Sequence, residues 1–182
     1  MVAAPQYQFH DLFPDTENFR DDVLNGLMLP RKALAPRYFY DARGSELFEA
    51  ICDLPEYYPT RTELAIMRAD VHDMARLLGP NCQLIEYGAG SGRKTRVLIE
   101  ATKPGAYVAV DISRTALRQC ATELAAAYPA VRVIAVCADY ARPLELPLRA
   151  DDAASRRVIY FPGSTIGNFT RADALQIGRA HV

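Results

Sequence analysis

The stretch that decides the fold is QLIEYGAGSGRKTR, residues 83–96. Gln83–Tyr87 has the length and apolar content of a short buried strand, and Lys94–Ala101 reads as a helix. Three glycines stand between them: Gly88, Gly90 and Gly92. Glycine lets a backbone turn tightly and lets a ligand approach where a Cβ would clash. A strand, a glycine-rich turn and a helix in this order predict the start of a nucleotide-binding sheet.

The alternation of strands and helices continues downstream. Further strands are predicted at Tyr107–Asp111, Val131–Cys137 and Val158–Phe161, with a helix over Arg114–Tyr128. Strands that alternate with helices indicate right-handed crossovers and a parallel sheet. We therefore expect an α/β fold whose four strands amount to about half of a doubly wound sheet.

Residues 1–80 are predicted to form a helical N-terminal segment ahead of a sheet domain over residues 81–175. The spacing of three apolar residues favours a first helix: Phe19, Val23 and Leu27. A second, short helix is predicted to turn three apolar side chains inward: Leu47, Phe48 and Ile51. We expect this segment to contribute to a binding site on the sheet.

A longer third helix is predicted from its capping and its apolar stripe. Thr60 and Glu63 match the capping box, which places the helix start at Arg61. Residues at spacings of three and four are predicted to form one buried stripe: Leu64, Met67, Val71, Met74 and Leu78.

Two tyrosines stand on a stiff ledge just before this helix. Tyr57 and Tyr58 lie between Pro55 and Pro59. Proline fixes φ and disfavours helical geometry in the residue before it. A phenol both donates and accepts hydrogen bonds, and one that is ordered in advance loses little entropy on binding. We interpret Tyr58 as a packing residue of this ledge.

Composition excludes several classes of function. Among 182 residues, 21 Lys and Arg balance 22 Asp and Glu, for a net charge of −1 without a basic stripe, so nucleic acid is not an expected partner. The four cysteines form no C-x-x-C pair and the three histidines lie far apart, so we predict free thiols, a reducing compartment and no metal. We see neither a signal peptide nor a membrane-spanning run, and expect a cytoplasmic protein.

Acidic residues stand at the ends of three predicted strands. Glu86 comes two residues before Gly88, Asp111 ends the next strand, and Asp139 with Tyr140 ends the third. A carboxylate about 20 residues after the glycine turn meets ribose hydroxyls in nucleotide-binding folds. Asp111 could instead cap a helix. Because parallel strands end at one rim, we expect these side chains to lie together.

The glycine spacing favours S-adenosylmethionine (SAM) over NAD. In the dinucleotide pattern G-x-G-x-x-G the third glycine falls at position 93, which is Arg93 here. G-x-G-x-G with a preceding carboxylate resembles the first motif of SAM-dependent methyltransferases. Lys94, in the first helical turn, is a candidate for the carboxylate of SAM or an ordinary surface lysine. An NAD(P)-dependent oxidoreductase stays open as the alternative.

Four blocks carry a closer resemblance. RYFYDARGSELFEAICDLPEYYPTRTE, IEYGAGSGRKTR, VCADY and FPGSTIGNF resemble, in order and spacing, the histidine-specific SAM-dependent methyltransferases. The likeness runs from about Phe19 to Leu175. It implies the N-terminal half of a Rossmann-like class I SAM methyltransferase sheet and trimethylation of the α-amino group of L-histidine to hercynine, in ergothioneine biosynthesis. A methyltransferase for another amino acid or amine, and a binding module without turnover, stay open.

The resemblance also implies roles for single residues. SAM contacts fall on the glycine turn and three strand ends: Gly88, Gly90, Lys94, Asp111, Asp139 and Tyr140. Contacts to histidine fall on Tyr57 and Asn168, with Tyr40 close by, although Asn168 could simply be a turn residue. Gly163 and Thr165 would shape the turn near the transferable methyl group. We predict no particular residue as the catalytic base.

The last seven residues, QIGRAHV (176–182), resemble the in-frame translation of a sequencing-library adapter. We expect this tail to be non-native, and the chain to be a piece of a longer protein and inactive by itself.

Overall fold

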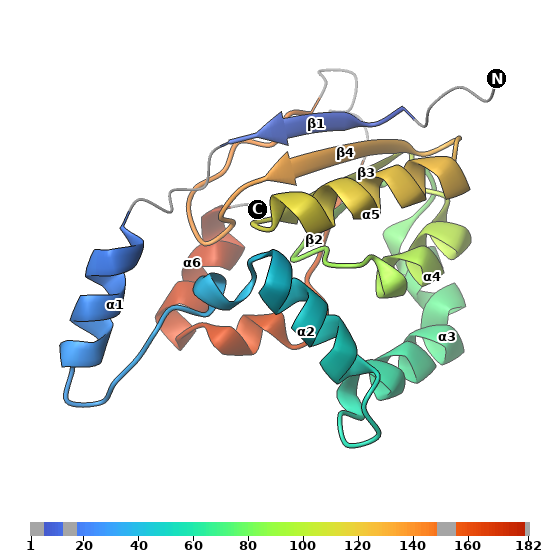
Figure 1. Cartoon of the computed structure of the whole chain (residues 1–182). Coiled ribbons are helices and arrows are strands. Elements are labelled where there is room, and N and C mark those ends of the chain that lie inside the picture. Colours follow the sequence, from blue (N-terminus) through green and yellow to red (C-terminus); the bar gives the residue numbers. More distant parts are fainter. Residues whose placement is uncertain (1–5, 13–17, 149–155, 181–182) are drawn as a thin grey trace.

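The computed structural model describes residues 6–12, 18–148 and 156–180. Within these ranges one sheet of parallel strands forms the centre of the molecule (Figure 1). Its strands are β1 (Gln8–Asp11), β2 (Gln83–Tyr87), β3 (Ala106–Asp111), β4 (Arg132–Cys137) and β5 (Arg157–Tyr160). Their order across the sheet is β1-β4-β3-β2-β5. Tyr87 pairs with Val110, and Asp111 with Cys137, so β2, β3 and β4 end at one common rim.

Helices surround the sheet and extend from it (Figure 1). They are α1 (Phe19–Met28), α2 (Ala42–Cys52), α3 (Pro59–Leu78), α4 (Arg93–Thr102), α5 (Arg114–Ala127) and α6 (Arg171–Ala180), with 3₁₀ turns η1 (Pro36–Phe39) and η3 (Thr165–Asn168). No helix in the described part of the chain is long and apolar enough to cross a membrane.

The core is divided by the sheet into two layers. On one face, α3, α4 and α5 pack through residues such as Met67, Leu98 and Leu117. On the other, Ile177 of α6 and the segment 140–148 pack against alternate strand residues, Ile85 and Val108 among them. This is the two-sided burial that a parallel sheet requires. The four cysteines are free thiols, and all but Cys52 are buried.

The predicted α/β architecture is confirmed, and the predicted strands agree with the structure to within one residue at each end. β1 was not predicted. Its sequence, QFHD, has no apolar run and a single strong β-former, Phe9, and its residues are only half-buried. Pairing with β4 at the edge of the sheet, rather than local propensity, makes this segment a strand.

The prediction that Thr60 and Glu63 form a capping box is wrong. α3 begins at Pro59, a favoured first helical residue, so Thr60 lies inside the helix and cannot cap it. The carboxylate of Glu63 instead contacts Lys94 and Gly163. The apolar stripe of α3 is confirmed, with Met67 buried and Val71, Met74 and Leu78 half-buried against the core.

Two predictions about packing in the N-terminal segment are also wrong. Leu47, Phe48 and Ile51 of α2 are exposed rather than inward, and of the three Phe48 lines a cavity. Tyr58 is 62% exposed and is not a packing residue. The non-helical ledge before α3 is confirmed, since residues 53–58 form turns between two helices. α6 includes Gln176–Ala180, and whether that part of the tail is native stays a prediction.

Candidate functional site

A cavity of about 1040 Å³ opens where β2, β3 and β4 end. Ligand sites commonly have about 300–1,000 Å³, so this one has room for a nucleoside and a second small molecule. All nine residues predicted as binding residues line it: Tyr40, Tyr57, Gly88, Gly90, Lys94, Asp111, Asp139, Tyr140 and Asn168. Residues from both the N-terminal segment and the sheet therefore meet in one place.

The glycine turn presents its backbone to the cavity. The Gly88 N–H donates to the Val110 carbonyl at 2.9 Å, which fixes the turn to the end of β3. Gly90 has φ +50°, and a Cβ built on it would meet nothing within 4 Å. Open space beside a backbone that favours glycine is what a close-lying ligand needs.

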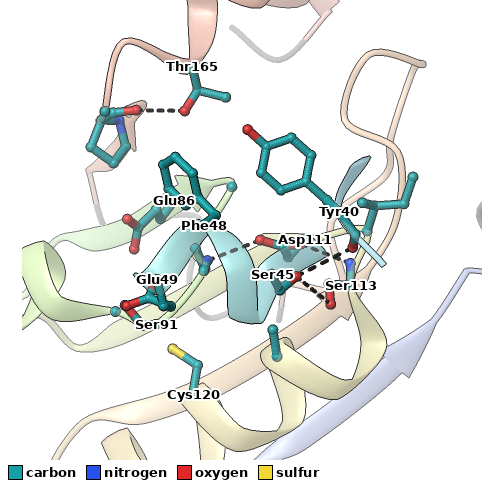
Figure 2. A pocket seen from close by; sticks show the side chains of 18 of the residues that line it. Tyr40, Ser45, Phe48, Glu49, Glu86, Ser91, Asp111, Ser113, Cys120 and Thr165 are labelled. Carbon is teal, nitrogen blue, oxygen red and sulfur yellow. Dashed lines mark hydrogen bonds between the residues drawn. The ribbon is translucent and has the colours of Figure 1, made fainter. Parts of the chain in front are cut away.

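Asp111 organises the same turn from the next strand. Its Oδ2 accepts from the Gly90 N–H at 3.0 Å and its Oδ1 from the Ser113 N–H at 2.8 Å (Figure 2). Burial raises the pKa of this carboxyl, against the effect of those backbone donors. These two hydrogen bonds do not involve any residue of α5 itself, which begins at Arg114. Each carboxylate oxygen of Asp111 keeps a second lone pair for a ligand hydroxyl.

Glu86 lies buried behind the glycine turn and faces α4. Its Oε2 accepts from the Tyr107 hydroxyl at 2.6 Å and also from the Thr95 hydroxyl. Burial raises the pKa of Glu86 to about 7, because the charged form loses its hydration there. The residue anchors the turn to α4 and β3.

Asp139 and Tyr140 line the cavity just after the end of β4. Asp139 Oδ2 accepts from Arg37 Nη1 at 3.2 Å, and its Oδ1 accepts from the Ala141 N–H at 3.0 Å. The Tyr140 ring stacks on Tyr87, with centroids 5.4 Å apart and planes at 11°. Burial raises the pKa of Tyr140 well above its usual value. An aromatic wall beside a carboxylate suits a purine base.

Lys94 is not an ordinary surface lysine. Its Nζ lies 2.6 Å from Glu63 Oε2, and only 18% of its side chain is exposed. Glu63 Oε1 accepts from the Gly163 N–H at 2.9 Å. These contacts join α3, the first turn of α4 and the loop after β5 at one point of the cavity wall.

Three aromatic residues of the N-terminal segment also line the cavity: Tyr40, Phe48 and Tyr57. Phe48 makes edge-to-face contacts with Tyr40 and with Tyr57, each at 6.1 Å between centroids, and so brings the two phenols near each other (Figure 2 shows Tyr40 and Phe48). Burial raises the pKa of Tyr57. Arg61 supports the ledge by donating to the Leu54 carbonyl at 3.2 Å and to that of Pro55.

Asn168 and Thr165 approach the cavity from η3. Asn168 ends this 3₁₀ turn and lines the cavity as an exposed residue. The Thr165 hydroxyl donates to the Pro162 carbonyl at 3.0 Å, which closes the turn after β5 (Figure 2).

Sequence reasoning missed several lining residues, among them Arg37, Ser45, Phe48 and Glu63. Phe48 and Glu63 gave signals that had another plausible meaning, an apolar helix face and a capping box. Arg37 gave none, since its partner Asp139 is 102 residues away in the chain.

Comparison with known proteins adds family information to this geometry. The family described as histidine-specific methyltransferase, SAM-dependent, matches residues 19–180. Histidine N-alpha-methyltransferase of Mycolicibacterium smegmatis is 39% identical over 86% of this chain and 48% of its own length. Histidine N-alpha-methyltransferase of Mycobacterium tuberculosis is 40% identical over 86% of this chain and 49% of its own length. Ergothioneine biosynthesis protein 1 of Neurospora crassa is 32% identical over 74% of this chain and 16% of its own.

The chain spans about half the length of the first two relatives. The match over nearly the whole chain nevertheless includes both the N-terminal segment and the sheet that line the cavity. The chain belongs to the family of histidine-specific, SAM-dependent methyltransferases.

Proposed function

We propose that this chain supplies the SAM site and part of the amino-acid site of an N-methyltransferase. The proposed reaction is trimethylation of the α-amino group of L-histidine to hercynine, in ergothioneine biosynthesis. The observation that carries the proposal is that residues expected for both ligands, Asp111 and Tyr57 among them, line one cavity. The names of relatives that act on histidine or belong to ergothioneine biosynthesis support the choice of substrate.

The residues at the strand ends fit the parts of SAM. The open side of Gly90 admits a ligand against the backbone, and the free lone pairs of Asp111 suit ribose hydroxyls. The Tyr140 ring and the Asp139 carboxylate suit the adenine ring and its amino group. The Lys94 ammonium suits the carboxylate at the methionine end. When bound, SAM supplies a methyl group made electrophilic by its positively charged sulfur.

The lining residues from the N-terminal segment and η3 suit an amino acid. We assign Tyr57 and Asn168 to hold the polar groups of histidine, with Tyr40 beside them. The Tyr57 phenol is neutral near pH 7, and burial raises its pKa further, so its hydroxyl can hydrogen-bond an amine without fixing a charge on it. A chain-terminal α-amino group has a pKa of about 7.7–8.0, so an unprotonated fraction of an α-amine is reachable near neutral pH. We assign the departing proton to water.

Positioning is the main contribution that these side chains make to the rate. Aligning two reactants inside a site can provide about 7–11 kcal/mol of a reaction barrier. The Tyr57 ledge is held in place by Arg61, and the turn after β5 is held by Thr165. The ledge and the turn, each held by hydrogen bonds, therefore favour one alignment of the amine with the methyl donor.

A methyl-transfer assay with a panel of amines tests the proposal. Histidine and other amino acids are incubated with the protein and methyl-labelled SAM, and the masses of the products are measured by mass spectrometry. We expect histidine to gain three labelled methyl groups with the whole protein and none with the 182-residue chain alone. Transfer to another amine, with none to histidine, would contradict the proposed substrate.

A further inference from the structure

We propose that Glu63 is a second ligand for the methionine end of SAM and accepts the α-ammonium group while Lys94 takes the α-carboxylate. The inference rests on the proposed function, because it assumes that SAM occupies the cavity. It gives a binding role to a residue whose sequence pattern suggested only a helix cap.

The two side chains form a matched pair of charges in the cavity wall. Glu63 Oε2 lies 2.6 Å from Lys94 Nζ, and both residues line the cavity. Their side chains are 30% and 18% exposed. Neither the positive nor the negative group is sealed off from a ligand in this position.

Both groups keep unused bonding capacity. An ammonium has three N–H donors, and one of those on Lys94 points to Glu63. A carboxylate has about four lone-pair sites, and Glu63 uses two, for Lys94 and for the Gly163 N–H. The α-carboxylate and α-ammonium of an amino acid can therefore contact Lys94 and Glu63 in a closed ring of alternating charges.

Gly163 fixes the direction of the Glu63 carboxylate. Its N–H donates to Oε1 at 2.9 Å, and its φ is +75°. A Cβ at Gly163 would lie 2.9 Å from Lys94 Nζ, so the turn fits closely around the ion pair. A carboxylate held by two partners is ordered before a ligand arrives, which lowers the entropic cost of binding.

A purely structural role explains the pair less well. Partly buried ion pairs contribute little net stability, because their desolvation offsets their attraction. Local helix capping is excluded, since α3 starts four residues before Glu63. The side chain instead spans from α3 to two other elements at the point where Lys94 faces the cavity. Binding of a zwitterionic amino-acid group would use both charges, Lys94 for its carboxylate and Glu63 for its ammonium group.

Three nucleoside ligands separate the two contacts. S-adenosylhomocysteine (SAH) has both polar groups, its deaminated analogue keeps only the carboxylate, and its decarboxylated analogue keeps only the amine. Their dissociation constants are measured by calorimetry for the 182-residue chain and for Glu63→Gln and Lys94→Met. Asp73→Asn serves as the matched control, because Asp73 is an exposed residue of the same helix with its own ion pair to Arg76.

The unchanged chain should bind SAH at least about tenfold more tightly than the deaminated analogue. Glu63→Gln should reduce this preference to near onefold, and Asp73→Asn should leave it intact. Lys94→Met should instead remove the preference for SAH over the decarboxylated analogue. A residue that only stabilised the wall would change the affinity for all three ligands together.

Other outcomes overturn the inference in distinguishable ways. If Glu63→Gln keeps the tenfold preference while Lys94→Met weakens SAH, the role of Glu63 is wrong and the proposed function stands. If the unchanged chain binds none of the three ligands, the proposed function and this inference fail together. Should Glu63→Gln not fold, as judged by circular dichroism, Glu63→Ala removes the carboxylate in another way, and an undiminished preference for SAH over the deaminated analogue there contradicts the inference.

Discussion

Arg37 and Asp139 are 102 residues apart in the chain, yet Nη1 of Arg37 lies 3.2 Å from Oδ2 of Asp139. The same guanidinium donates to Asp22 Oδ2 at 2.6 Å. The arginine thereby ties α1 and η1 to the end of β4, where the adenine of SAM is expected. Stability of the N-terminal segment and shape of the site are linked through this one side chain.

Replacing Arg37 by Met should loosen both the fold and the site. The substitution removes the shorter of two cationic contacts to Asp139, whose side chain is 13% exposed, and leaves the contact to Arg142 Nε at 4.0 Å. Hydrogen bonds to charged groups contribute about 1.5–3 kcal/mol, so we expect a loss of about 2 kcal/mol in unfolding free energy. Urea denaturation at pH 7 measures it, and proteolysis should cut residues 18–41 faster.

Arg43→Met is the control for that experiment. Arg43 pairs with Glu46 one helical turn away, and both side chains are well exposed. Surface pairs of this kind contribute about 0–1 kcal/mol. Equal losses from the two variants would show that the link between Arg37 and Asp139 has no special role.

Stability should depend on pH through Glu86. Its pKa rises from the ordinary 4.5 to about 7 on folding, because burial disfavours the charged form. The folded state therefore holds this proton more tightly than the unfolded state. Proton binding by Glu86 therefore stabilises the fold fully below pH 4.5, and this stabilisation is lost as the pH rises to about 7. The free energy of unfolding should decrease by about 3 kcal/mol over this range.

Glu86→Gln should remove that pH dependence, since an amide keeps an acceptor for Thr95 and Tyr107 but does not titrate. The measurement is the free energy of unfolding by urea from pH 4.5 to 8 for both proteins. If the unfolding free energies of the unchanged chain and of Glu86→Gln depend on pH in the same way, Glu86 does not bind a proton on folding.

The parts of the fold that the sequence predicted well have local signals. Gln83–Tyr87 combines apolar residues with a following glycine turn, and the strand has these bounds in the structure. The carboxylates and glycines at the strand ends could be placed together because parallel strands end at one rim. Periodicity and strand order were sufficient to place these residues at one edge of the sheet.

The N-terminal half of the site could not be predicted in the same way. The apolar spacing of α2 predicts a buried face, but Phe48 points to a cavity, and a sequence does not distinguish a cavity from a core. Thr60 and Glu63 satisfy a capping pattern, yet Pro59 starts the helix earlier and frees Glu63 for Lys94. These outcomes depend on contacts between distant elements.

Gly90→Ala should impair binding as well as folding. The open space beside Gly90 admits a methyl group, and a left-handed backbone at a residue other than glycine costs about 1–2 kcal/mol. That methyl group would occupy the space into which SAH is expected to pack. We expect SAH affinity to fall at least about tenfold, measured by calorimetry.

Gly79→Ala gives the matched comparison. Gly79 ends α3 with φ +81°, also has open space around it, and does not line the cavity. It should cost stability while leaving SAH affinity unchanged. If Gly90→Ala binds SAH as well as Gly79→Ala does, the glycine turn is not part of the site.

Tyr57→Phe and Tyr58→Phe should differ in their effect on histidine. Tyr57 lines the cavity, whereas Tyr58 is 62% exposed and does not. Loss of the Tyr57 hydroxyl should raise the KM for histidine in the whole protein about tenfold, since a missing hydrogen bond contributes about 0.5–1.5 kcal/mol. SAH affinity should be unchanged in both variants, and an equal KM for both would remove Tyr57 from the substrate site.

Calorimetric titration of the chain with SAH, and in parallel with NADH, tests the central claim most directly. We predict saturable binding of one SAH per chain, no saturable heat from NADH, and loss of SAH binding in Asp111→Asn, in which Oδ2 or Oδ1 becomes an amide. Saturable binding of NADH without binding of SAH, or SAH binding that is indifferent to Asp111→Asn, would contradict a SAM site at the carboxyl ends of β2, β3 and β4.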